Sequence, residues 1–154
     1  IALITTPKHV NVGTLRRQGY EKALIENYIK TNESLILEVD EKLAIKKQIE
    51  VLFKQDIDGV FAVNEIYAAI AMKIAKEKGL KIPADISIIG FIDGLISEYS
   101  SPSITTIAQH GFTMGKQAVE LLIERIENES EVYKPKKIVI SSNLKLREST
   151  KPSS

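Results

Sequence analysis

The sequence contains no cysteine and no tryptophan, and it has only two histidines. Without cysteine, disulfide bonds and zinc sites built from thiolates are excluded. The histidines, His9 and His110, lie far apart in different motifs, and we expect both to be solvated loop residues. We therefore predict no metal site and no cofactor.

The sequence also lacks an excess of charge of one sign. Its 21 lysines and arginines are balanced by 20 aspartates and glutamates, which gives a net charge of +1. A nucleic-acid-binding surface is normally a basic patch or stripe, and none stands out along the chain. If the protein binds DNA, we expect it to do so through a part that is not in this chain.

Long apolar runs and catalytic motifs are missing as well. No apolar stretch approaches the roughly 18 residues that suggest a membrane-spanning helix, and no signal peptide opens the chain. The nucleophile elbow, the Walker loop, the G-x-G-x-x-G loop and the H-E-x-x-H pattern are all absent. Carboxylates such as Glu120 and Glu124 lie beside basic residues, which is typical of a solvated helix face. We predict no catalytic residue, no enzymatic activity and no contact with a membrane.

The most informative stretch that is present runs from Gly79 to Gln109. Within it, Ile86 to Phe91 is an almost unbroken apolar run, typical of a strand buried on both faces of a parallel sheet. A loop over 92–94 follows, and ligands bind at the carboxyl ends of strands in open α/β sheets. The β-branched run Ile104 to Ile107 predicts the next strand.

The rest of the chain alternates short apolar runs with helical periodicity. Asp40 is predicted to cap the second helix and Asn64 the third, and Gly79 to end the third helix. This alternation predicts βαβ units and a parallel sheet with right-handed crossovers. Strands are predicted at 1–4, 35–39, 60–63, 86–91, 104–107, 137–140 and 144–147, and helices near 15–28, 44–52, 66–78 and 112–127.

Several separated motifs resemble the LacI/GalR family of transcriptional regulators, in the part that binds the effector. The segments GLKIPADISIIGF and SPSITTIAQ follow the family's order and spacing. Arg16-x-x-Gly19-Tyr20 resembles its R-x-x-G-[FYW] helix, and Phe61 to Glu65 resembles its F-x-x-N-D strand end. The closing Leu146 to Thr150 resembles its terminal L-x-x-R-E-S.

The resemblance implies an α/β fold of the periplasmic-binding-protein-like I type, a flavodoxin- or Rossmann-like parallel sheet flanked by helices. Family members have two such lobes, three crossovers between them and an N-terminal helix-turn-helix headpiece. The resemblance assigns residues 1–109 to the C-terminal lobe and residues 110–142 to a crossover helix and strand of the N-terminal lobe. It assigns 143–150 to a returning strand of the C-terminal lobe and 151–154 to a tail.

On this assignment the headpiece and most of the N-terminal lobe lie outside the chain. Because the chain starts inside a strand-like run and without Met, we expect it to be a piece of a longer protein. The helix over 112–127 would normally pack on the missing lobe. We expect its apolar stripe to be covered by a neighbouring chain or by altered packing, since exposed patches of this size usually mark an interface.

Arg16 and Asn64 are the main candidates for contact with the effector. A guanidinium in the first turn of a helix can bind sugar hydroxyls, a carboxylate or a phosphate, and the resemblance implies this role for Arg16. The alternative is a surface arginine, the role we expect for the neighbouring Arg17. The amide of Asn64 can donate and accept together; its alternative role is the helix cap alone.

Asp93 is a third candidate, at a point where the chain departs from the family. The family reads G-[FY]-D-[DN], and its first aspartate binds effector hydroxyls, but here that position is Ile92. Either Asp93 takes over this contact, or the ligand lacks it, or Asp93 is a turn residue before Gly94. Weaker candidates are Asn11 and Val12 in the loop after the first strand, and Val39, where the family often places an aromatic residue.

The resemblance also implies a homodimer. The dimer surface would use the helix after the third strand and part of the loop after the fourth. The residues at these positions are Ile66, Tyr67, Ala69, Ile70, Lys73, Leu95, Ile96 and Tyr99.

These features favour the effector-binding and dimerisation part of a bacterial, cytoplasmic LacI-type regulator that senses a sugar or sugar derivative. The alternative is a periplasmic sugar-binding protein of a transporter, which shares the fold. The terminal motifs favour the regulator, whereas a signal peptide in the parent sequence would favour the transporter. A small flavodoxin-like enzyme or phosphate-binding domain is disfavoured by the lack of a catalytic constellation.

Overall fold

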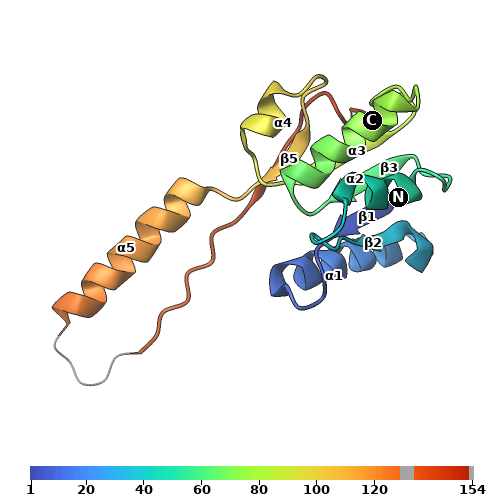
Figure 1. The fold of residues 1–154 in the computed structure, drawn as a ribbon. Helices are drawn as coiled ribbons and strands as arrows, with labels where there is room; N and C mark the ends of the chain where they lie inside the picture. The colour runs from blue at the N-terminus through green and yellow to red at the C-terminus, as the bar shows by residue number, and fades with distance from the viewer. Residues whose placement is uncertain (129–133, 153–154) are drawn as a thin grey trace.

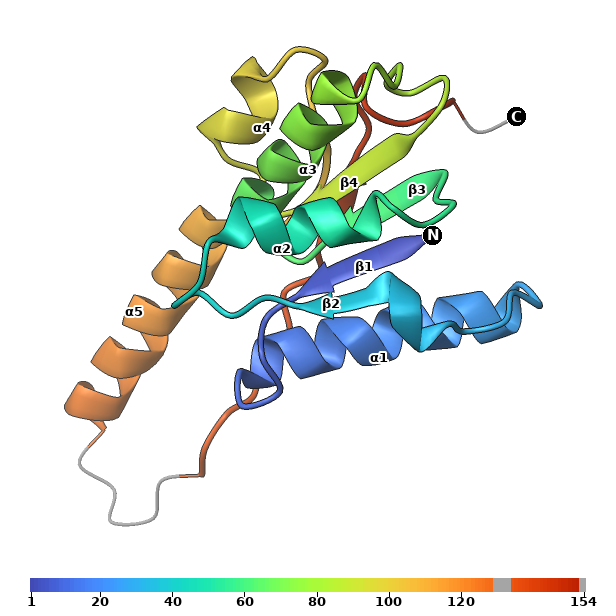
Figure 2. The ribbon, with the colours of Figure 1, turned by 45° about the vertical axis from the view of Figure 1, so that its right-hand side comes forward.

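The computed structural model describes residues 1–128 and 134–152 and consists of one sheet with helices on both faces (Figures 1 and 2). Strands β1 to β5 are parallel, and β6 pairs antiparallel with β5. The strand order is β2-β1-β3-β4-β5-β6, which confirms the predicted α/β fold class. The elements are β1 (Ala2–Thr5), α1 (Asn11–Glu26), the 3-10 turn η1 (Glu33–Leu35), β2 (Ile36–Glu38), α2 (Ile45–Leu52), β3 (Gly59–Ala62), α3 (Glu65–Glu77), β4 (Ser87–Phe91), α4 (Leu95–Tyr99), β5 (Thr105–Ala108), α5 (Gly111–Glu127) and β6 (Asn143–Lys145).

The core lies between the sheet and helices α2 and α3, and Tyr20 and Leu24 of α1 extend it on the other face. Figure 2 shows these two helices on one face of the sheet and α1 on the other, as right-handed crossovers in opposite directions require. Helix α3 packs closely against β4 at Gly90. A Cβ added at Gly90 would lie only 3.2 Å from the Cβ of Ala68, so the absence of a side chain there permits the close packing. All four residues of β1 are buried, as expected for a strand inside a parallel sheet.

Two of the three predicted helix signals are confirmed. The side chain of Asn64 accepts a hydrogen bond of 2.8 Å from the backbone N–H of Tyr67, and Gly79 ends α3 with a φ of +77°. The cap predicted at Asp40 is wrong. Its carboxylate accepts from the N–H of Lys42 within a local turn, and α2 begins only at Ile45.

The segment after β5 leaves the sheet. Figure 1 shows α5 projecting away from the other helices, and none of its residues is buried. The strand predicted over Lys137 to Ile140 is wrong: the chain over 134–142 has no regular structure, since no described strand pairs with it. The last strand is Asn143 to Lys145 rather than Leu144 to Arg147, because Arg147 turns toward other partners. One short helix, α4, forms where only a loop was predicted.

The terminal motif, Leu146 to Thr150, connects the returning segment to the sheet through hydrogen bonds. Ser149 is fully buried. Its hydroxyl donates to the carbonyl of Ile88 at 2.5 Å and accepts from the N–H of Thr105 at 2.8 Å. The backbone N–H of Ile88 donates in turn to the carbonyl of Ser149 at 2.8 Å. Residues from the end of the chain therefore belong to the same packed unit as β4 and β5.

Candidate functional site

Three elements meet at the carboxyl edge of the sheet around Arg16. This residue lies in the second turn of α1, and its Nη1 donates to the carbonyl of Val63, just after β3, at 2.6 Å. Its guanidinium carbon lies 3.9 Å from the centroid of the Phe91 ring, at the end of β4. A cation over an aromatic face at this distance is attracted to it. The structure thus brings Arg16 to the strand ends where ligands bind in such sheets.

The neighbouring Arg17 has a different environment. It forms ion pairs with Glu21 at 2.7 Å, Glu33 at 2.9 Å and Glu38 at 3.1 Å. Glu21 and Glu33 raise the pKa of Arg17 against the effect of desolvation, with the hydrogen bond to Glu21 as the largest cause. We expected Arg17 to be solvated, and this expectation is wrong, because its side chain is only 19% exposed.

Arg16 has no such compensation. No carboxylate within the described residues forms an ion pair with it, and its one hydrogen bond goes to a neutral carbonyl. Burial lowers the pKa of Arg16 because desolvation disfavours the charged form. Of five N–H donors on a guanidinium, four therefore have no protein acceptor in this part of the chain.

Asn64 lies one residue beyond Val63 at the same edge and is half-buried. Its Oδ1 caps α3, which leaves the two amide protons for another acceptor. The two predicted roles of Asn64 are therefore compatible. The role as a cap is confirmed, and the contact with an effector stays a prediction.

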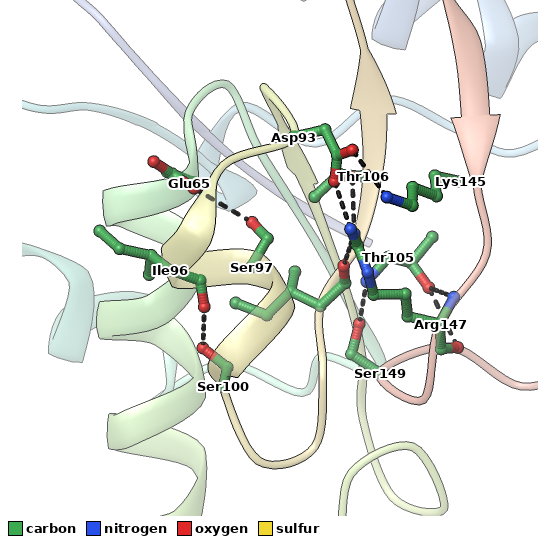
Figure 3. Close-up of polar contacts among 11 residues, drawn as sticks. Glu65, Asp93, Ile96, Ser97, Ser100, Thr105, Thr106, Lys145, Arg147 and Ser149 are labelled. Atoms are coloured by element: carbon green, nitrogen blue, oxygen red, sulfur yellow. Dashed lines mark hydrogen bonds and ion pairs between the residues drawn. The ribbon is translucent and has the colours of Figure 1, made fainter.

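Asp93 lies in a network that the sequence does not reveal (Figure 3). Its Oδ1 accepts from Arg147 and from the hydroxyl of Thr106 at 3.1 Å, and its Oδ2 accepts from the ammonium of Lys145 at 3.0 Å. Burial opposes ionisation of Asp93, but the hydrogen bonds from Arg147, Lys145 and Thr106 outweigh it and lower the pKa of the carboxyl. Arg147 also donates to the carbonyl of Ile104 at 2.7 Å. Both oxygens of Asp93 thus hold the returning segment to the loop after β4, and Oδ1 also bonds to β5 through Thr106.

Ile92, at the family's aspartate position, adopts a φ of +76°. A β-branched residue in this left-handed region is an outlier, and its side chain is partly exposed. Its N–H donates to the carbonyl of Ile107 at 3.1 Å, which holds the turn against β5. The residue at this position is apolar and Asp93 points into its own network, so neither residue presents a free carboxylate.

The weaker candidates fall in different places. Asn11 and Val12 are exposed in the first turn of α1, close in sequence to Arg16. Val39 is fully buried, and its N–H donates to the carbonyl of Thr5 at 2.8 Å. The structure therefore gives no support to a ligand contact through the side chain of Val39, and the contacts predicted for Asn11 and Val12 stay predictions.

An apolar groove of about 930 Å³ extends from this edge over the sheet face that carries α1. It is lined by Leu24 of α1 and by Phe61, Ile89, Phe91 and Ile107 of strands β3, β4 and β5, and Arg16 and Gln109 are also part of its lining. Parallel sheets are normally covered on both faces. Here α1 covers only part of this face, and three neighbouring strands contribute apolar side chains to open space.

Most residues predicted for the dimer surface lie on the outside of α3 and α4. Ile66, Lys73, Leu95, Ile96 and Tyr99 are exposed, and Ala69 and Ile70 are half-buried.

Tyr67 differs, because its ring is only 2% exposed and is part of the core. Its hydroxyl donates to the carboxylate of Glu41 at 3.0 Å, and burial together with this hydrogen bond raises the pKa of Tyr67 to about 12. Tyr67 offers no surface to a partner in this structure.

No helix over 1–128 and 134–152 is long and apolar enough to cross a membrane, and the same residues contain no cluster of three acidic or histidine side chains that could hold a metal ion.

Comparison with known proteins gives a consistent result. Residues 1–150 match the family model described as periplasmic binding protein-like domain. The transcriptional regulator MalR of Clostridium butyricum is 38% identical over 144 residues, which cover 91% of this chain and 42% of MalR. The repressor PurR of Haemophilus influenzae is 32% identical over 155 residues, 98% of this chain and 46% of PurR.

Solved structures agree with these relatives. The complex of the regulator CelR with cellobiose superposes with a TM-score of 0.86 at 28% identity, covering 96% of this chain and 46% of CelR. CcpA of Lactococcus lactis superposes with a TM-score of 0.85 at 26% identity, covering 97% of this chain and 55% of CcpA. The chain thus spans about half the length of the relatives it matches.

Proposed function

The chain belongs to the LacI family of transcriptional regulators, within its periplasmic binding protein-like domain, and from this premise we propose that it senses a small-molecule effector, a sugar or sugar derivative. In this proposal it supplies one lobe of a hinged binding site in a cytoplasmic, DNA-binding regulator. The observation that carries it is the environment of Arg16 at the carboxyl edge of the sheet. A half-buried guanidinium that has four spare donors and no acidic partner among the described residues is suited to an oxygen-rich ligand.

The ligand contacts we propose are those that lie around Arg16. Asn64 offers its amide protons from the same edge, and Asn11 and Val12 lie in the first turn of the helix that carries Arg16. The named ligand of a structural neighbour, cellobiose bound to CelR, supports a sugar as the chemical class. Phe91 supports this class too, because an aromatic side chain beside polar groups is common in small-molecule sites.

We propose that the second wall of the site comes from the half of the relatives that this chain does not span. Two apolar surfaces need a partner: the groove on the α1 face of the sheet and the stripe of α5. In this proposal 1–109 and 143–150 form the C-terminal lobe, and 110–142 reaches into the other lobe. Burial of these surfaces would then hold the two lobes together.

A dimer through α3 and α4 is the assembly we propose for the regulator. Leu95 and Tyr99 are 72% and 78% exposed, and both are large apolar side chains on one short helix. Together with Ile66 and Ile96, which are also exposed, they make up the candidate interface, since exposed apolar patches usually mark one. Closure of the lobes on ligand would change how two such subunits present their DNA-binding parts.

The relatives that match are named transcriptional regulators, so they favour regulation over the periplasmic transporter component and over an enzyme. A signal peptide encoded upstream of Ile1 would reverse this preference, whereas a helix-turn-helix would support it.

The proposed site is tested by nuclear magnetic resonance on the 15N-labelled chain, which detects millimolar binding. Cellobiose, maltose, glucose and ribose are each titrated, and we expect saturable shifts at the Nε–H of Arg16 and the side-chain amide of Asn64. Arg16→Ala should abolish the shifts, and Arg17→Ala, the matched control, should keep them. Shifts of equal size in Arg16→Ala would remove Arg16 from the site.

A further inference from the structure

We infer that the effector carries a negatively charged group, a carboxylate or a phosphate, and that Arg16 binds this group. The inference rests on the proposed function and narrows its ligand class from sugars in general to sugar acids and sugar phosphates. It follows from the charges that the structure places around the carboxyl edge of the sheet.

Two consecutive arginines, Arg16 and Arg17, differ in how their charges are compensated. Arg17 is surrounded by Glu21, Glu33 and Glu38, so its charge is compensated within the protein. Within the described residues, Arg16 has only the carbonyl of Val63 and the face of Phe91. Stacking on a ring fixes the plane of a guanidinium and leaves its edge for a forked contact. Carboxylates and phosphates have the geometry that matches such a fork.

The chain offers no free carboxylate at the position where the family uses an acid to bind effector hydroxyls. At that position this chain has Ile92, which cannot accept a hydrogen bond through its side chain. Asp93 is bound through both oxygens to Arg147, Lys145 and Thr106 (Figure 3). The side chain of Arg147 is only 9% exposed, and withdrawal of Asp93 would leave this buried charge without its partner. Asp93 is therefore unsuited to serve a ligand.

The other acids near this edge have partners other than Arg16. Glu65 points to the hydroxyl of Ser97 at 3.4 Å, on the α4 side (Figure 3). Glu41 accepts from Tyr67 at 3.0 Å, and Glu38 is paired with Arg17. None of them forms an ion pair with Arg16.

A neutral sugar would bury the Arg16 charge further without supplying a counter-charge. An anionic ligand supplies one, and hydrogen bonds between charged partners are stronger than those to neutral groups.

The test compares matched probes on the 15N-labelled chain: glucose, glucuronate, glucose 6-phosphate and inorganic phosphate. We expect glucuronate or glucose 6-phosphate to bind at Arg16 on the order of tenfold more tightly than glucose, the ratio that corresponds to about 1.4 kcal/mol. Tighter binding of glucuronate identifies a carboxylate, and tighter binding of glucose 6-phosphate a phosphate. Inorganic phosphate alone should bind more weakly than the better sugar anion.

Variants of Arg16 distinguish the effect of its positive charge from the effect of its forked hydrogen-bonding geometry. Arg16→Lys should keep part of the preference for the anion, Arg16→Ala should lose it, and Arg17→Ala should keep all of it. An unchanged amide spectrum elsewhere shows that a variant is folded. If glucose binds at Arg16 as tightly as the anions, the inference is overturned while the proposed function stands. If neither sugars nor sugar anions shift Arg16, both are overturned.

Discussion

The sheet-centred lobe and helix α5 use the same kind of apolar residue to opposite effect. In the lobe, residues such as Leu3, Ile4 and Ile88 are completely buried. In α5, Phe112 and Ile126 are 87% and 72% exposed, and no residue is buried. Both regions have regular secondary structure, so an apolar pattern specifies the helix or strand but not what covers it. The stripe of α5 has the character of half an interface.

The largest contrast should appear when one buried and one projecting residue are truncated. Ile88→Ala removes a fully buried side chain from the central strand β4, and we expect a loss of about 2–5 kcal/mol in the free energy of unfolding. Ile126→Ala on α5 should change it by less than about 0.5 kcal/mol. Urea denaturation followed by circular dichroism measures both. Equal losses would show that α5 is packed in solution.

The next contrast compares a partly buried ion pair with an exposed one. Asp93→Asn weakens the hydrogen bonds to Arg147 and Lys145, and we expect a loss of about 2 kcal/mol, as for hydrogen bonds to charged groups. Glu124→Gln removes the partner of Lys136 on α5, where both side chains are about half exposed, and should have almost no effect.

The same pair sets a pH dependence. Because the pKa of Asp93 is lowered in the folded state, its contribution to stability is present above the pKa of about 3.9 of an unfolded aspartate. It is lost as the pH falls from there through the folded pKa. The free energy of unfolding should therefore fall less in Asp93→Asn than in the unchanged chain when the pH is lowered from about 5 to about 3. An identical acid profile in both proteins would contradict the role of Asp93.

The smallest contrast concerns the first turns of α3 and α5. Asn64→Ala removes a side-chain cap from α3, which packs against the sheet, and this should cost about 1 kcal/mol. His110 precedes α5 without a side-chain cap, so His110→Ala should be close to neutral. Urea denaturation measures the free energy of unfolding of both variants. A loss for His110→Ala as large as that for Asn64→Ala would show that the residue before the helix matters equally in both regions.

Particular residues show how far sequence reasoning reached. The apolar run of β4, the cap at Asn64 and the stop at Gly79 were all predictable, because each depends on neighbouring residues alone. The ion pairs of Arg17 and the capture of Asp93 were not, since Glu33, Glu38, Lys145 and Arg147 are far away in sequence. Helix α4 was missed because a helix of five residues is too short to show a period.

The sequence by itself determined the alternation of strands and helices, and hence the parallel sheet, because backbone periodicity is a local property. Its motifs also brought Arg16 and Asn64 into view. Only the tertiary structure decided which charges are compensated: it brought Glu33 and Glu38 to Arg17, committed Asp93 to the returning segment and, among residues 1–128 and 134–152, left Arg16 without an acidic partner. The physical reason is that electrostatic energy depends on distance in space, which the order of residues along the chain does not set.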